Sequence, residues 1–428
     1  MGTLEDFKSF IEEVYQRLEK MSEEELSHEA GVALSKGRMF FLDKDFGVFY
    51  FTPVEEKKYL KLIDRFEKEY SSDEKLSRTG IEKLLKTALF SSLWRGDDQP
   101  KEFNKRLEIA IESLYIGLTK ETSIYTVFVP VFGGEKEGLP LVFGDVRFVI
   151  YNDNQLRKIK EIKKKKGRNL IQARAQNRPI NEIKKTNLWG SLCAIVNVEA
   201  KDEGASLEKA TRKTKKAVDM LNFLAFFTPY QHGGLFLPGE REQTHKVFPI
   251  LKGKDFYRIR FDRSKPITNY NFKKLRNDRR AWRIFQKIHK DFKEEETHEV
   301  KKAILTGIQW VGKSLLEPNP EQAFLWYFIA LEGVIIPKRK EEIRSEIGSR
   351  VGKLIGTTKK EEEEVERWLK KLYDIRSLIV HDGMREIAPT DLGRLRSVCL
   401  VTMLEVLKSK EIKGINSLKD FEKWYKNR

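Results

Sequence analysis

The last third of the chain limits the possible folds most strongly, because it is built almost entirely of amphipathic segments of helical length. From residue 278 onward, apolar residues recur at spacings of three and four, the pattern of a helix with one buried face. Prolines or an Asp-Gly pair separate several of these segments, and short connections of this kind favour a helical bundle. The expected helices lie at 281–292, 299–316, 321–336, 341–355, 361–380 and 391–408.

The first two thirds of the chain predict a mixture of helices and strands. The region 1–120 is expected to be mostly helical, with one short strand at 46–51. The region 121–265 is rich in β-branched and aromatic runs, which are typical of strands. Its expected elements are strands at 123–132, 141–151, 192–198 and 256–261 and a helix at 206–227, followed by a linker at 263–277. The fold class is therefore α+β, ending in an all-α bundle at 275–428.

Positive charge dominates the composition and favours a polyanionic partner. The chain has 82 Lys and Arg against 65 Asp and Glu, a net charge of +17. Much of the excess falls in a basic insertion at 151–190, which predicts salt-sensitive contacts with a nucleic-acid backbone. The alternative is a solvated surface segment without a partner. The residues expected to contact phosphates are Lys163, Lys164, Lys165, Lys166 and Arg168.

The sequence favours a cytoplasmic protein without a membrane anchor. Cys193 and Cys399 lie far apart in apolar runs, as expected of small buried residues in a reduced compartment. The strongest apolar run, 324–336, is interrupted by Glu332 and is shorter than the ~20 residues that a spanning helix needs. A membrane partner is therefore not expected.

One stretch of the predicted bundle carries groups suited to phosphate chemistry. Residues 372–383 read LYDIRSLIVHDG and place Arg376 five residues before His381. On a straight helix, residues five apart point about 140° away from each other. The two side chains would therefore converge only if the helix ended between them, and the Asp-Gly pair at 382–383 is compatible with such an end.

This stretch resembles the R-x4-6-H signature of HEPN domains, a family of helical bundles that includes many metal-independent ribonucleases. The Apea-like group of that family is similar in the Arg-Ser-x-x-Val-His arrangement at 376–381 and in the upstream segments 307–310, 320 and 324–332. The resemblance covers about the last third of the chain. It implies RNA as the substrate, a homodimer in which two motifs meet, and a toxin or phage-defence role.

The chemistry implied by the resemblance is RNA cleavage without a metal or other cofactor. An arginine grips phosphate through several donors, and a histidine exchanges protons near neutral pH. Arg376 would stabilise charge on the phosphate and His381 would transfer protons. Ser377 would orient the phosphate or His381. The expected products are a 2′,3′-cyclic phosphate and a 5′-hydroxyl. The alternative function is a non-catalytic protein that binds nucleic acid or dimerises through the bundle.

Three carboxylates are expected near this pair. Glu332 lies inside an apolar helix, where an unpaired charge is costly, so Arg376 is its candidate partner. Asp374 and Asp382 could instead bridge Arg376 locally, while His381 caps the helix end.

A second motif, at 307–314, matches the phosphate-binding loop G-x4-G-K-[ST] and would make Lys313 the lysine of an ATPase. That loop needs a preceding strand and a long following helix, whereas the residues before 307 have helical character and Pro318 follows closely. The segment is therefore predicted to be a packed helix, and no nucleotide cofactor is expected. No pattern of His, Cys, Asp or Glu specifies a metal.

Overall fold

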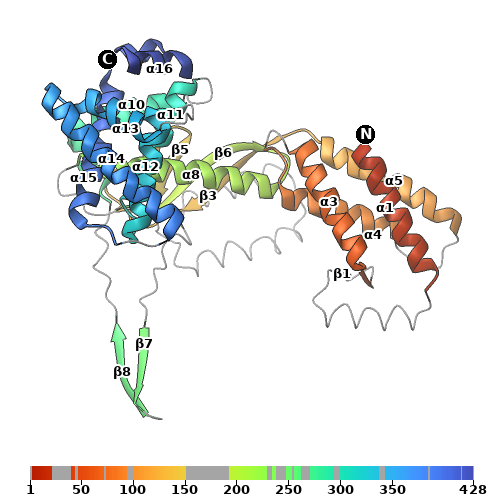
Figure 1. Ribbon diagram of the computed structural model, residues 1–428. Coiled ribbons are helices and arrows are strands. Elements are labelled where there is room, and N and C mark those ends of the chain that lie inside the picture. The colour runs from red at the N-terminus through yellow and green to blue at the C-terminus, as the bar shows by residue number, and fades with distance from the viewer. Residues whose placement is uncertain are drawn as a thin grey trace. The chain divides into compact units, whose positions relative to one another are not determined.

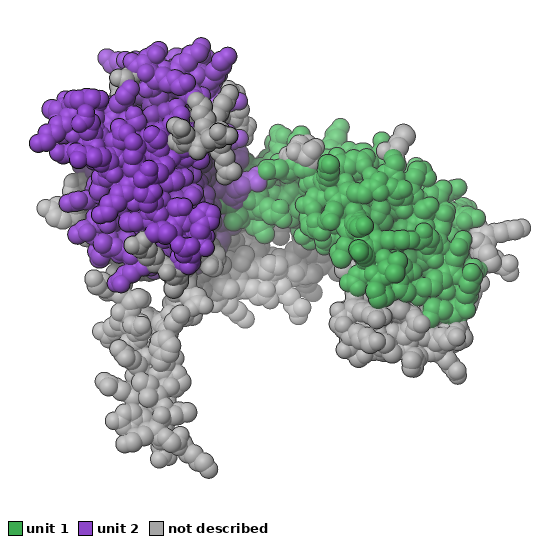
Figure 2. Space-filling model, in the orientation of Figure 1, with its two compact units in different colours: residues 1–127, 197–211 green, residues 128–196, 212–428 purple. Residues whose placement is uncertain are grey.

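The computed structural model describes residues 2–21, 40–43, 47–71, 74–93, 100–150, 192–228, 234–237, 247–252, 255–261, 270–293, 298–336, 343–383, 386–415 and 417–427. It confirms an α+β fold that ends in a helical bundle. The chain forms two compact units (Figures 1 and 2). Unit 1 comprises residues 1–127 and 197–211, and unit 2 comprises 128–196 and 212–428. The region expected at 121–265 thus contributes to both units.

The described residues of unit 1 include four long helices around an aromatic core. They are α1 (Gly2–Glu19), α3 (Pro53–Tyr70), α4 (Arg78–Leu93) and α5 (Pro100–Thr119). Phe7 and Phe66 are fully buried and meet edge to face, with ring centroids 5.9 Å apart. Helix α3 begins with a capping box, in which Thr52 and Glu55 bond each other's backbone N–H. The strand expected at 46–51 is β2 (Gly47–Tyr50), and it pairs antiparallel with β1 (Phe40–Asp43).

Within the described part of the chain, the largest sheet has four strands in the order β3-β6-β5-β4. Their bounds are β3 Ser123–Pro130, β4 Leu141–Phe143, β5 Val146–Ile150 and β6 Leu192–Ala200. The single strand expected at 141–151 is in fact an antiparallel hairpin. Gly144 makes its turn with a φ of +58°, and a Cβ there would lie 2.0 Å from Cδ1 of Phe292. Only glycine fits this position, because it tolerates positive φ and needs no room for a side chain.

Helix α8 (Glu203–Ala225), expected at 206–227, contributes residues to both units. Strands β7 (Val247–Lys252) and β8 (Asp255–Phe261) pair as an antiparallel hairpin, of which only the second strand was expected. Part of the expected linker is helical, because α9 (Phe272–Asn277) begins there with Asn271 as its N-cap.

The bundle of unit 2 follows the expected succession of helices (Figure 1). Its long helices are α10 (Arg279–Lys293), α11 (Glu299–Ser314), α12 (Pro320–Ile335), α13 (Ile343–Ile355), α14 (Lys359–Asp382) and α15 (Pro389–Lys408). Asn319 caps α12, and Pro320 occupies its first turn, where a missing N–H is harmless. A short helix, α16 (Leu418–Lys426), follows and buries Phe421 and Tyr425.

Both cysteines are buried free thiols, as expected. Burial raises the pKa of Cys193 to about 12 and that of Cys399 well above its ordinary value. Among the described residues, no helix is both long and apolar enough to cross a membrane.

Candidate functional site

Helix α14 presents the predicted catalytic residues. Thr358 caps its N-terminus by accepting a hydrogen bond from the backbone N–H of Glu361, and Glu361 and Glu362 add negative charge to the first turn. The helix continues through Asp382 and ends at Gly383, whose φ is +87°. Arg376 and His381 therefore lie in one uninterrupted helix.

The helical geometry separates these two residues within one chain. They differ by about 140° around the axis and by about 7.5 Å along it. Arg376 is half-buried on the side that faces the bundle, whereas His381 is exposed. The expectation that the helix would end between them is wrong, because Asp382-Gly383 stops it only after His381.

Glu332 of α12 lies beside Arg376, which confirms the pairing expected from its place in an apolar helix. Nη2 of Arg376 lies 3.4 Å from Oε1 of Glu332, and the two side chains are 25% and 23% exposed. A charge-assisted hydrogen bond is normally about 2.7–2.9 Å long, so this ion pair is loose. Nε of Arg376 is buried and has no hydrogen-bond acceptor among the described residues. At least one donor of the guanidinium is therefore unsatisfied within this part of the chain.

Tyr373 completes the surroundings of Arg376. Its ring centroid lies 5.3 Å from Cζ of the arginine, a cation–π distance, and its ring meets that of Phe328 edge to face at 5.6 Å. Burial raises the pKa of Tyr373, Glu332 raises it further, and Arg376 lowers it. The distances from Arg376 to Glu332 and to Tyr373 thus place the phenol, the carboxylate and the guanidinium in one cluster.

The other predicted residues of this helix occupy different surroundings. Both oxygens of Asp374 accept hydrogen bonds of 2.7 Å from Arg344, and no ion pair joins Asp374 to Arg376 among the described residues. Asp382 is exposed, and Ser377 is half-buried. Leu378 and Val380, next to the motif residues, are 38% and 51% exposed.

The match to a phosphate-binding loop lies within α11, as expected. A Cβ on Gly312 would lie 1.7 Å from the backbone oxygen of Asp219 in α8, and one on Gly307 would lie 2.3 Å from Cγ2 of Val334 in α12. The hydroxyl of Ser314 donates to the backbone oxygen of Trp310, 2.7 Å away. The glycines therefore allow close helix packing, and the backbone amides are used within the helix.

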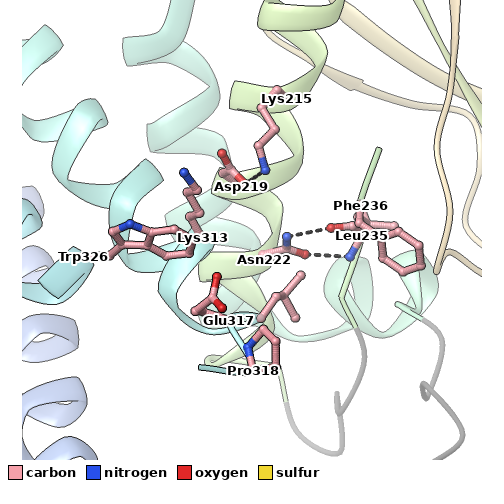
Figure 3. A pocket seen from close by; sticks show the side chains of 10 residues that line it. Lys215, Asp219, Asn222, Leu235, Phe236, Lys313, Glu317, Pro318 and Trp326 are labelled. Carbon is pink, nitrogen blue, oxygen red and sulfur yellow. Dashed lines mark hydrogen bonds and ion pairs between the residues drawn. The ribbon is translucent and has the colours of Figure 1, made fainter. Parts of the chain in front are cut away.

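The same packing creates a cavity of about 320 Å³ in unit 2 (Figure 3). It lies between α8, the end of α11, the start of α12 and the backbone at 235–236. Ten residues line it: Lys215, Asp219, Asn222, Leu235, Phe236, Lys313, Leu316, Glu317, Pro318 and Trp326. Of these residues, only Lys313 belongs to a motif recognised in the sequence. A signal was present, since Asp219 and Asn222 interrupt the apolar run 217–227.

The described residues contain no group of three or more His, Cys, Asp or Glu placed to hold a metal ion. The basic insertion at 151–190 lies outside the described residues, so Lys163, Lys164, Lys165, Lys166 and Arg168 stay predictions.

Comparisons with family models, with curated proteins and with solved structures found no match. The fold itself defines the class, an α+β protein with a C-terminal helical bundle.

Proposed function

We propose that this chain is a metal-independent endoribonuclease that uses Arg376 and His381. The observation that carries the proposal is the state of Arg376, a guanidinium that is 25% exposed and forms only a loose ion pair with Glu332. A phosphate oxygen is an acceptor that suits such a guanidinium. The positive charge of the chain supports a polyanionic substrate.

The separation of the two residues makes a homodimer part of the proposal. Arg376 and His381 lie on different faces of α14. Around the helix axis, the exposed Val380 falls between them and the exposed Leu378 falls next to His381. Packing of two such helix ends would cover these apolar side chains and bring two motifs to one phosphate. His381 would remove the 2′-hydroxyl proton, the 2′-oxygen would attack phosphorus, and His381 of the partner subunit would protonate the departing 5′-oxygen.

The test is cleavage of an end-labelled RNA by the full chain in the presence of EDTA. The wild-type protein should produce 2′,3′-cyclic phosphate and 5′-hydroxyl ends. His381→Ala should lower the cleavage rate by about 10²- to 10⁴-fold, the usual contribution of a general acid or base, while RNA binding is retained. Lys371→Ala, a change at an exposed position of the same helix, is the matched control and should cleave normally.

A mixing experiment tests whether the site is shared. After subunit exchange with a ninefold excess of His381→Ala protein, wild-type activity should fall to about a tenth, because most wild-type subunits then have an inactive partner. Unchanged activity would mean that each chain has a complete site of its own.

The second candidate is a non-catalytic protein that binds RNA or dimerises through the bundle. The divergence of Arg376 and His381 on a continuous helix favours it. Equal RNA binding without cleavage by both wild type and His381→Ala would establish it in place of the nuclease.

A further inference from the structure

We infer that the cavity between α8, α11 and α12 binds a single nucleotide unit, either free or within an RNA strand. Its volume of about 320 Å³ lies at the lower end of the range of small-ligand sites, about 300–1,000 Å³. The site differs from a phosphate-binding loop, because side chains rather than backbone amides would make the contacts.

One wall of the cavity consists of buried polar side chains that form hydrogen bonds with other protein groups. Asn222 is 2% exposed. Its side-chain amide donates a hydrogen bond to the backbone oxygen of Leu235 at 2.9 Å and accepts one from the backbone N–H of Leu235 at 2.8 Å. Asp219 is 1% exposed and accepts hydrogen bonds from Lys215 at 3.0 Å and from Gln309 at 3.2 Å. Because these groups hold one another, the wall keeps its shape before a ligand arrives.

Lys313 supplies the group that would contact phosphate. Its Nζ lies 4.1 Å from the ring centroid of Trp326 and 4.7 Å from that of Trp310. Among the described carboxylates, none forms an ion pair with it. The two indoles therefore hold an ammonium group whose charge is not neutralised, and Figure 3 shows it beside Trp326 on the cavity wall. Lysine is a common phosphate ligand, acting as a point charge.

Glu317 and the aromatic rings suit the other end of a nucleotide. Oε1 of Glu317 accepts a hydrogen bond from the backbone N–H of Asn319 at 3.1 Å, and among the described residues no donor reaches its other oxygen. A carboxylate of this kind accepts hydrogen bonds from the exocyclic amino group of a base, as with cytosine N4. Trp326 is half-buried and offers ring surface on the cavity wall, and bases stack on aromatic side chains irrespective of sequence.

The charges therefore predict a preference among nucleotides. The lysine favours a phosphate over a neutral nucleoside, and the carboxylate favours a base with an amino group over uracil. The inference does not depend on RNA cleavage, since no residue of the cavity belongs to the proposed Arg376–His381 site.

The test is isothermal titration of the full chain, in EDTA, with CMP, UMP, cytidine and inorganic phosphate. CMP should bind at least about tenfold more tightly than each of the other three. Lys313→Gln should weaken CMP binding about tenfold or more, and Lys313→Arg should restore it, because arginine keeps the cation beside the indoles. Glu317→Gln should reduce the difference between CMP and UMP. Lys353→Gln, at an exposed position of α13, is the matched control and should bind as wild type.

A cytidine-containing RNA pentamer separates the two sources of the nucleotide. Lys313-dependent binding of CMP assigns the site to a free nucleotide, and Lys313-dependent binding of the pentamer alone assigns it to a strand. The inference is overturned if neither ligand binds at millimolar concentration, if a folded Lys313→Gln protein binds as wild type, or if phosphate alone binds as tightly as CMP. Melting temperature and circular dichroism establish that each variant is folded.

Discussion

Helices α11 and α14 each carry a short motif associated with phosphate, and the structure uses the two motifs differently. In α11, Gly312 packs against the backbone of α8, and the neighbouring Lys313 reaches a cavity. In α14, the helix directs Arg376 toward Glu332 and leaves His381 exposed. A motif defined by spacing therefore predicts a site only when its secondary structure is known, because that structure decides which side chains share a face.

The largest expected effect tests whether α11 is held by close packing. Gly312→Ala should lower the free energy of unfolding by about 3 kcal/mol, since its Cβ would lie 1.7 Å from a backbone oxygen that cannot rotate away. Chemical denaturation measures the change. Gly333→Ala in α12 is the matched control, because a Cβ there meets nothing within 4 Å; it should stabilise the protein by about 0.5–1 kcal/mol. Similar effects of the two changes would contradict the packing explanation.

A smaller effect tests the ion pair that orients Arg376. Glu332→Gln keeps the shape of the side chain but removes the carboxylate beside a half-buried guanidinium. It should cost about 1–2 kcal/mol in unfolding free energy. Glu366→Gln, which breaks a comparably exposed pair with Lys370, should cost less than about 0.5 kcal/mol. An equal cost would mean that Glu332 has no special role in holding Arg376.

The electrostatic cluster around Arg376 also predicts how Tyr373 titrates. Burial and then Glu332 raise the pKa of Tyr373, and Arg376 lowers it. Glu332→Gln should therefore lower this pKa, and Arg376→Gln should raise it. Carbon NMR of labelled tyrosines, assigned with Tyr373→Phe, measures both shifts. Opposite directions, or no change, would show that the three groups are not coupled.

The same raised pKa has a consequence for stability. Above pH 10, the ordinary value for tyrosine, the unfolded chain loses the phenol proton while the folded chain still holds it. The free energy of unfolding should therefore fall as the pH rises through this window and should not respond to Tyr373 below it. Tyr373→Phe should remove this component of the alkaline instability.

The smallest effect concerns the exposed pair on the outer side of α14. Arg344 donates two hydrogen bonds of 2.7 Å to Asp374, and both side chains are more than half exposed. Water and salt screen such pairs. Arg344→Ala should leave the melting temperature unchanged within error and should not alter RNA cleavage. A clear loss of cleavage would mean that Asp374 acts on the site after all.

The helices of the bundle were predictable because their periodicity and their stop signals agree. The segments 299–316 and 321–336 correspond closely to α11 and α12. The sheet was predicted less well. The hairpin β4–β5 turns at Gly144 and Asp145, a two-residue hairpin signal that was included in a single expected strand. Strand β7 was missed, although its partner β8 was expected.

The candidate site was predictable only in part. The pairing of Glu332 with Arg376 followed from the cost of a lone charge in an apolar helix. The partner of Asp374 did not, because Asp374 and Arg344 are both more than half exposed, where a charge needs no partner.

The sequence by itself determined the fold class, the order of helices in the bundle and the excess of positive charge, because periodicity and composition are local properties. Only the tertiary structure decided which charges meet. It placed Arg376 beside Glu332, separated it from His381, and assembled Lys313, Asp219 and Trp326 around one cavity. The physical reason is that the period of a helix sets which of its own side chains share a face. Contacts between helices depend instead on packing that no single segment encodes.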